Sequence, residues 1–128
     1  MGRIITKVTV ANALHPEKSI YFDALVDTGA SLLVLPKAWK ERLGEFVATR
    51  NVKVETADQR AIDGEICGPV SIQIEGFDQI FNEVAFLDME PSNGGYEPLV
   101  GYIVLEQSRV AVDMVGHRLV QTKYMDLK

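Results

Sequence analysis

Residues 24–35 have the sequence ALVDTGASLLVL, in which a single acidic residue stands between two apolar segments. Asp27 directly follows a run with the character of a buried strand, and Thr28, Gly29 and Ser31 come before the chain turns apolar again. Asp, Thr and Gly are common in surface turns. Such turns are rarely framed by apolar segments on both sides, so we expect this loop to be tucked inside the protein.

Each residue type suits a loop in that position. The hydroxyl groups of Thr28 and Ser31 can pair backbone polar groups that a buried loop would otherwise leave without partners. Gly29 permits backbone angles and a close approach that a side chain would block. A carboxylate is costly there unless it is hydrogen-bonded or shares a proton. That cost indicates a chemical use for Asp27.

The remaining segments alternate mostly in twos, as strands do. Strands are expected at 3–10, 19–26, 52–56, 70–75, 80–87, 110–113 and 118–122, with a hairpin turn at 115–116 and another turn around His15-Pro16. Short helices are expected at 36–43, which Pro36 can open and Gly44 can close, and at 102–107. The sequence therefore predicts an all-β fold with one or two short helices, in a single domain spanning residues 1–128.

The composition excludes several classes of function. The chain has 13 Lys and Arg against 18 Asp and Glu, whereas nucleic-acid binders need a surplus of basic residues. A single cysteine excludes a disulfide framework and a Cys-rich zinc site. No apolar run approaches the length of a membrane span, and the first residues carry no secretory signal. We therefore expect a soluble cytoplasmic protein that binds neither nucleic acid nor membrane.

Three features of the sequence resemble the retropepsin-like aspartic proteases. Residues 25–30, LVDTGA, match the family's loop of two hydrophobic residues, Asp, Thr or Ser, Gly and Ala. Leu99-Val100-Gly101 and the short helix after it match a second feature late in the chain. Between them the family has a β-hairpin flap, and residues 52–74 can supply two long strands with a turn near Ala57-Asp58-Gln59. The motifs keep the family's order and spacing over residues 4–120.

This resemblance implies the closed β-barrel of the acid proteases and an aspartic endopeptidase that cleaves peptide bonds with water, without metal or cofactor. The chemistry needs two carboxyl groups facing one water, and the chain contains one Asp-Thr-Gly. The resemblance therefore implies a homodimer with Asp27 of each subunit on the two-fold axis. Residues 118–123 or 4–10 are the candidates for the strand that joins the subunits.

The resemblance also implies roles for the residues around Asp27. Thr28 would lock the two loops together by hydrogen bonds from its hydroxyl group to the backbone, and the Gly29 carbonyl would help bind the peptide. Further candidates for substrate contact are Ala30 and the flap residues Ala57, Asp58 and Gln59, and the loop at 88–97 is expected to contribute to specificity.

Two positions depart from the viral members of the family. Those members usually have an acidic residue directly after Asp-Thr-Gly-Ala and an Arg after the late glycine, where this chain has Ser31 and Tyr102. The ion pair of the viral members is therefore absent, and the sequence looks more like the cellular and bacterial members. The alternative function is a retropepsin-fold module that dimerises or binds peptides and cleaves little or nothing. The intact Asp-Thr-Gly favours the active enzyme.

The other conspicuous residues have simpler explanations. His15 and His117 lie beside turn signals and are expected in solvated loops. Cys67 lies within a strand pattern and is expected to be a buried apolar residue, and Trp39 is expected in the core. Asp63-Gly64 lacks the apolar flanks of the first motif and is expected to form a turn.

Overall fold

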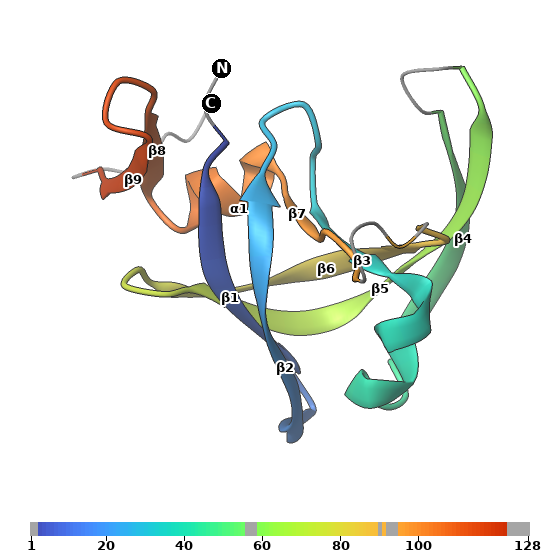
Figure 1. Ribbon diagram of the computed structural model, residues 1–128. Coiled ribbons are helices and arrows are strands. Elements are labelled where there is room, and N and C mark those ends of the chain that lie inside the picture. Colours follow the sequence, from blue (N-terminus) through green and yellow to red (C-terminus); the bar gives the residue numbers. More distant parts are fainter. Residues whose placement is uncertain (1–2, 56–58, 90, 92–94, 123–128) are drawn as a thin grey trace.

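The computed structural model describes residues 3–55, 59–89, 91 and 95–122 (Figure 1). Its elements are, in chain order, β1 (Ile5–Asn12), β2 (His15–Val26), β3 (Leu33–Pro36), the 3-10 helix η1 (Lys37–Leu43), β4 (Ala48–Glu55), β5 (Ala61–Ile74), β6 (Gln79–Leu87), β7 (Leu99–Val100), α1 (Tyr102–Gln107), β8 (Val110–Asp113) and β9 (Arg118–Gln121). Among these described residues, no helix is long and apolar enough to cross a membrane. The predicted all-β fold with one or two short helices is confirmed, and the structure has two.

Seven strands form one sheet in the order β1-β2-β7-β3-β6-β5-β4. Because β1 pairs with β5 as well as with β2, six of these strands close into a ring and β4 is added outside it (Figure 1). The predicted barrel is thus a ring of strands closed by the pairing of β1 with β5. β8 and β9 form a separate antiparallel pair, which confirms the predicted hairpin.

The core is built from alternate residues of the ring strands. Its fully buried side chains include Val8 and Val10 of β1, Leu33 and Leu35 of β3, Ile72 and Ile74 of β5, Val84 and Phe86 of β6, and Val100 of β7. Each such side chain contributes about 1.5–3 kcal/mol by leaving water. The period of two therefore directs one face of each strand into a shared core.

The first hairpin turns two residues before the predicted position. Its turn consists of Ala13 and Leu14, and β2 already begins at His15, which pairs with Asn12. The Asn12 side chain sets this turn, because its Oδ1 accepts a hydrogen bond from the Leu14 N–H at 3.0 Å. Pro16 is exposed near the start of its strand, where proline is tolerated.

The predicted turn at Asp63-Gly64 is wrong, because both residues lie within β5. Gly64 pairs with Val52 of β4 and Leu87 of β6. A Cβ atom at Gly64 would lie 2.4 Å from Leu87 Cδ2 and 2.9 Å from the Phe86 carbonyl oxygen. The glycine is therefore needed for close contact between strands.

The helix predictions hold with one shift. α1 covers the predicted 102–107, whereas η1 begins at Lys37 because Pro36 is still extended and ends β3. Gly44 closes η1 with a φ of 76°, in the left-handed region that favours glycine.

Asn12 also fixes η1 to the first hairpin. Its buried side-chain amide donates to the carbonyl oxygens of Leu43 at 2.9 Å and Glu45 at 2.7 Å. The end of η1 is therefore tied to the junction of β1 and β2 by one polar side chain.

We expect Asn12→Ala to lower the free energy of unfolding by about 2–4 kcal/mol, because the buried Leu43 carbonyl loses its donor and the turn loses its acceptor. Denaturant unfolding measures this change. Asn51→Ala, at an exposed position of β4, is the matched control and should change stability by less than about 0.5 kcal/mol. Equal losses in the two variants would contradict the anchoring role of Asn12.

Candidate active site

Asp27 begins the loop that joins β2 to β3, and β7 holds it from the side. β7 runs parallel to β2, with Leu25 opposite Leu99 and Val26 opposite Val100. The Asp27 N–H donates to the Val100 carbonyl oxygen at 2.9 Å, which continues this pairing by one residue. The backbone position of Asp27 is therefore set by the late apolar segment.

The rest of the loop is paired with the start of α1. The carbonyl oxygen of Ala30 accepts from the Tyr102 N–H at 2.9 Å, and that of Ser31 accepts from the Ile103 N–H at 3.1 Å. From the sequence, the hydroxyl groups of Thr28 and Ser31 were candidates for pairing the backbone of this loop. In the described structure, the backbone of residues 100–103 supplies it instead.

Gly101 permits this contact between the two motifs. A Cβ atom there would lie 2.4 Å from the Ser31 carbonyl carbon, 2.5 Å from the Ser31 oxygen and 2.6 Å from the Leu32 oxygen. All three are backbone atoms and cannot turn aside as a side chain could. Glycine is therefore required at position 101, because the backbone of the first loop lies too close to leave room for a side chain.

The Asp27 side chain lies at the surface of the chain. Its Oδ1 accepts a hydrogen bond from the Gly29 N–H at 2.9 Å, and the residue is half-buried. Thr28 and Gly29 are exposed, and Ala30 is half-buried. The expectation that the loop is tucked inside is therefore wrong for the single chain. Leu33, Val34 and Leu35 after the loop are buried and Leu25 and Val26 before it are half-buried, but the loop itself reaches the surface.

The predicted flap is a hairpin of two long strands. β4 and β5 pair from Ala48 with Gly68 to Glu55 with Ala61, and the hairpin extends away from the ring (Figure 1). Gln59 is exposed with a φ of 64°, a conformation typical of turns. Ala57 and Asp58 lie outside the described residues.

The structure also locates Cys67, Trp39 and the two histidines, for which no catalytic role is expected. Cys67 is buried, as predicted, and Trp39 is half-buried against the core. His117 is exposed in the turn before β9, as expected, whereas the exposed His15 begins β2. The predicted loop at 88–97 lies partly outside the described residues.

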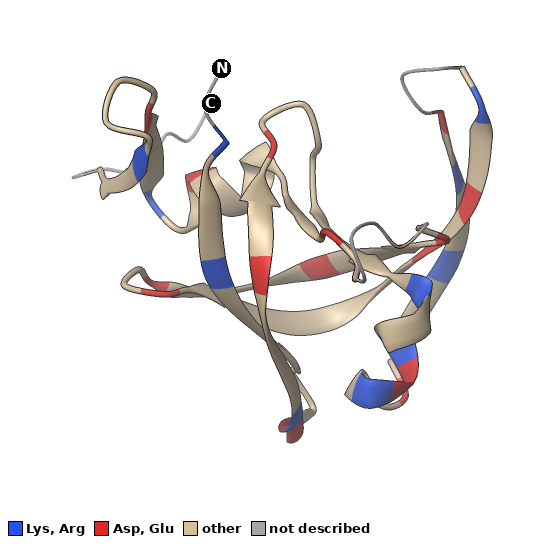
Figure 2. Cartoon of the chain, in the orientation of Figure 1, with Lys and Arg blue, Asp and Glu red and all other residues tan. Residues whose placement is uncertain are grey.

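Acidic and basic residues are spread over many elements of the described chain (Figure 2). Tyr102 is exposed and bonds to the Asp27 loop through its backbone. Among the described residues, no group of three or more His, Cys, Asp or Glu gathers as metal ligands would. At the end of β8, hydrogen bonds from the Gly116 N–H and then from Arg118 lower the pKa of Asp113.

The sequence matches the aspartyl protease family over residues 8–102, and the chain belongs to this family. The fold is similar to that of the EIAV protease complexed with the inhibitor HBY-793, with a TM-score of 0.60, 20% identity, and coverage of 83% of this chain and 88% of that chain. The resemblance to retropepsin-like aspartic proteases is thereby confirmed. Comparison with curated proteins gives no match.

Two further solved structures match with lower scores. A retropepsin-like aspartic protease from Rickettsia conorii has a TM-score of 0.45 and 20% identity, with 88% of this chain and 85% of that chain covered. A Legionella pneumophila protein with unknown function has a TM-score of 0.46 and 15% identity, with 93% of each chain covered.

We expect Gly101→Ala to destabilise the protein by about 1–3 kcal/mol, because the added methyl group forces β7 away from the Asp27 loop. Thermal unfolding measures this loss, and NMR chemical shifts of residues 27–31 report the displaced loop. Gly95→Ala is the matched control, since a Cβ there meets nothing within 4 Å. A Gly101→Ala protein with the stability and loop spectrum of the Gly95 variant would contradict the contact between the two motifs.

Proposed function

We propose that the protein is an aspartic endopeptidase that works as a homodimer, with one Asp27 carboxyl group from each chain. The observation that supports this proposal most directly is how Asp27 is held and exposed. Its backbone is fixed by Val100 while its carboxylate remains at the surface, where a second chain can reach it. A rigid but open carboxylate suits a site that two chains complete.

The reaction follows from two carboxyl groups held close together. Two like charges at short distance do not both ionise easily, so the pair holds one proton. The ionised carboxylate takes a proton from water as the water oxygen attacks the peptide carbonyl carbon. The protonated carboxyl group donates a hydrogen bond to the carbonyl oxygen. Transfer of a proton to the peptide nitrogen then lets the C–N bond break and yields an acid and an amine.

A single chain contains only half of this pair. The other Asp-Gly of the chain, Asp63-Gly64, lies inside β5, so it does not supply a second catalytic loop. A two-fold axis beside Asp27 would bring two identical loops together. The exposed Thr28 is then free to donate its hydroxyl proton to the backbone of the partner loop.

The free edges of the strands favour one joining segment over the other. β1 is paired on both sides from Val8 to Asn12, whereas β9 pairs only with β8 in the described part of the chain. An unpaired edge is a ready surface for a second strand. We therefore propose that the segment 118–123 joins the subunits in preference to 4–10, its last residue lying outside the described ranges.

The substrate is proposed to be an extended peptide lying between the Asp27 loops and the β4–β5 hairpin. The Gly29 carbonyl and Ala30 would contact its backbone from below, and Ala57, Asp58 and Gln59 from the hairpin. Closure of the hairpin would exclude water from the reacting atoms, which strengthens their hydrogen bonds.

Asp27→Asn tests this function. The substitution keeps the shape of the side chain and removes the ionisable group, so peptidase activity should fall by roughly 10³-fold or more while the fold survives. Cleavage of a peptide library identifies substrates of the unaltered protein, and the rates of both proteins are then compared on one of them. Circular dichroism checks the fold.

Asp23→Asn is the matched control, because it makes the same change at an exposed position of β2 outside the proposed site and should leave activity nearly unchanged. Equal activity in the Asp27 variant and the unaltered protein would exclude the aspartic mechanism. Peptide binding that persists without any cleavage in the unaltered protein would favour the alternative, a module that dimerises or binds peptides.

A further inference from the structure

The β4–β5 hairpin leaves the body of the protein at Gly64. β5 pairs with β6 from Gln73 back to Gly64, where the last partner is Leu87. From Asp63 to Ala61, β5 pairs with β4 alone among the described strands. The hairpin therefore has its base at Gly64 and Glu65 and projects beyond them as a two-stranded ribbon (Figure 1).

An ion pair joins this base to η1. Lys40 Nζ lies 3.0 Å from each of the two carboxylate oxygens of Glu65. The two side chains are 31% and 20% exposed, which makes this the most buried of the ion pairs among the described residues. Such a pair is screened less by salt and constrains its partners more than a fully exposed one.

The helix that carries Lys40 is itself firmly held. Trp39 packs against Phe22 of β2 with ring centroids 5.5 Å apart, and Leu43 is fully buried. The Asn12 side chain binds the carbonyl groups at the end of the helix. A bond from Glu65 to Lys40 therefore ties the hairpin to the body of the protein.

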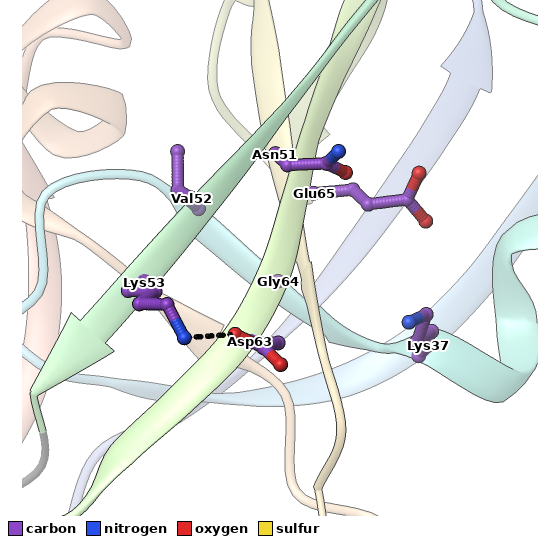
Figure 3. Close-up of a pocket in the computed structure, with 7 residues that line it drawn as sticks. All are labelled: Lys37, Asn51, Val52, Lys53, Asp63, Gly64 and Glu65. Carbon is purple, nitrogen blue, oxygen red and sulfur yellow. Dashed lines mark hydrogen bonds and ion pairs between the residues drawn. The ribbon is translucent and has the colours of Figure 1, made fainter.

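A cavity separates the hairpin from η1 beside this bond. Its volume is about 560 Å³, and it is lined by Lys37, Asn51, Val52, Lys53, Asp63, Gly64 and Glu65 (Figure 3). The side chains of Asn51 and Glu65 point across it toward the side on which Lys37 lies (Figure 3). The space gives the ribbon room to tilt, and Asp27 is not among the residues that line it.

We propose that Lys40 and Glu65 form a positioning pair that sets the resting angle of the β4–β5 hairpin over the substrate. The proposal rests on the proposed peptidase function, which requires the hairpin to cover a peptide. Because the pair touches no reacting atom, its effect falls on substrate binding. A second ion pair, Arg50 with Glu83 at 3.2 Å, joins β4 to β6, but its side chains are 54% and 42% exposed.

Amide hydrogen exchange, followed by mass spectrometry, tests whether the ion pair restrains the hairpin. This test does not require activity. In Lys40→Gln and in Glu65→Gln, exchange in residues 48–55 and 61–64 should quicken about threefold to tenfold, while exchange in β1 and β2 stays unchanged. The reversed pair, Lys40→Glu with Glu65→Lys, should restore slow exchange.

Asp63→Asn is the matched control. It removes the ion pair between Lys53 and Asp63, whose side chains are 76% and 79% exposed and which joins the two hairpin strands only to each other. Exchange in this variant should stay within about twofold of the unaltered protein.

On a cleaved peptide, the two single variants should raise KM about threefold to tenfold and leave kcat within about twofold. Unchanged hairpin exchange, or exchange that quickens equally throughout the chain, would overturn the proposal, as would a loss confined to kcat. If the unaltered protein cleaves no peptide, the peptidase function fails, and the exchange result alone then decides whether the pair holds the hairpin.

Discussion

Gly101 lies against the carbonyl groups of Ser31 and Leu32 with no room for a side chain, and the arrangement of the site depends on this contact. It lets β7 pair beside β2 and lets the start of α1 donate two backbone N–H groups to the Asp27 loop. These backbone hydrogen bonds hold a loop in which Thr28 and Gly29 are exposed. Two segments separated by about seventy residues therefore act as one structural unit.

The residue types in the sequence predicted the two motifs of this unit, but not the contacts between them. The apolar flanks and the glycines identified both motifs, but the only partners that the sequence suggested for the loop backbone were the hydroxyl groups of Thr28 and Ser31. The backbone of residues 100–103 provides the partners, and this follows only from the parallel register of β2 and β7. The same limit explains Asp63-Gly64, where a dipeptide typical of turns serves close packing against Leu87. In both places, contacts between strands distant in sequence outweighed the local conformational preference of the residues.

The molecule combines an Asp27 loop that is fixed to the ring with a hairpin that projects from the ring. Asp27 is held through backbone hydrogen bonds to the ring, whereas the β4–β5 hairpin is paired to the ring only up to Gly64. In our proposal, the ion pair of Lys40 and Glu65 restrains the part that leaves the ring. Fixed acids and a movable cover are what a water-excluding hydrolytic site requires. The first property was predictable from a motif. The family resemblance also predicted the hairpin, but not the residue at which it leaves the ring, because this depends on where the pairing between β5 and β6 ends.

The central claim is that two Asp27 carboxyl groups from two chains form one catalytic centre. Mixing unaltered chains with altered ones tests this claim most directly. Unaltered protein and Asp27→Asn protein would be combined in varying ratios, allowed to exchange subunits, and assayed at constant total concentration. If chains pair at random and only dimers with two intact Asp27 residues are active, activity should follow the square of the unaltered fraction and fall to about one quarter in an equal mixture. Activity that instead falls in direct proportion to the unaltered fraction, to about one half in an equal mixture, would show that each chain works alone and would contradict the account.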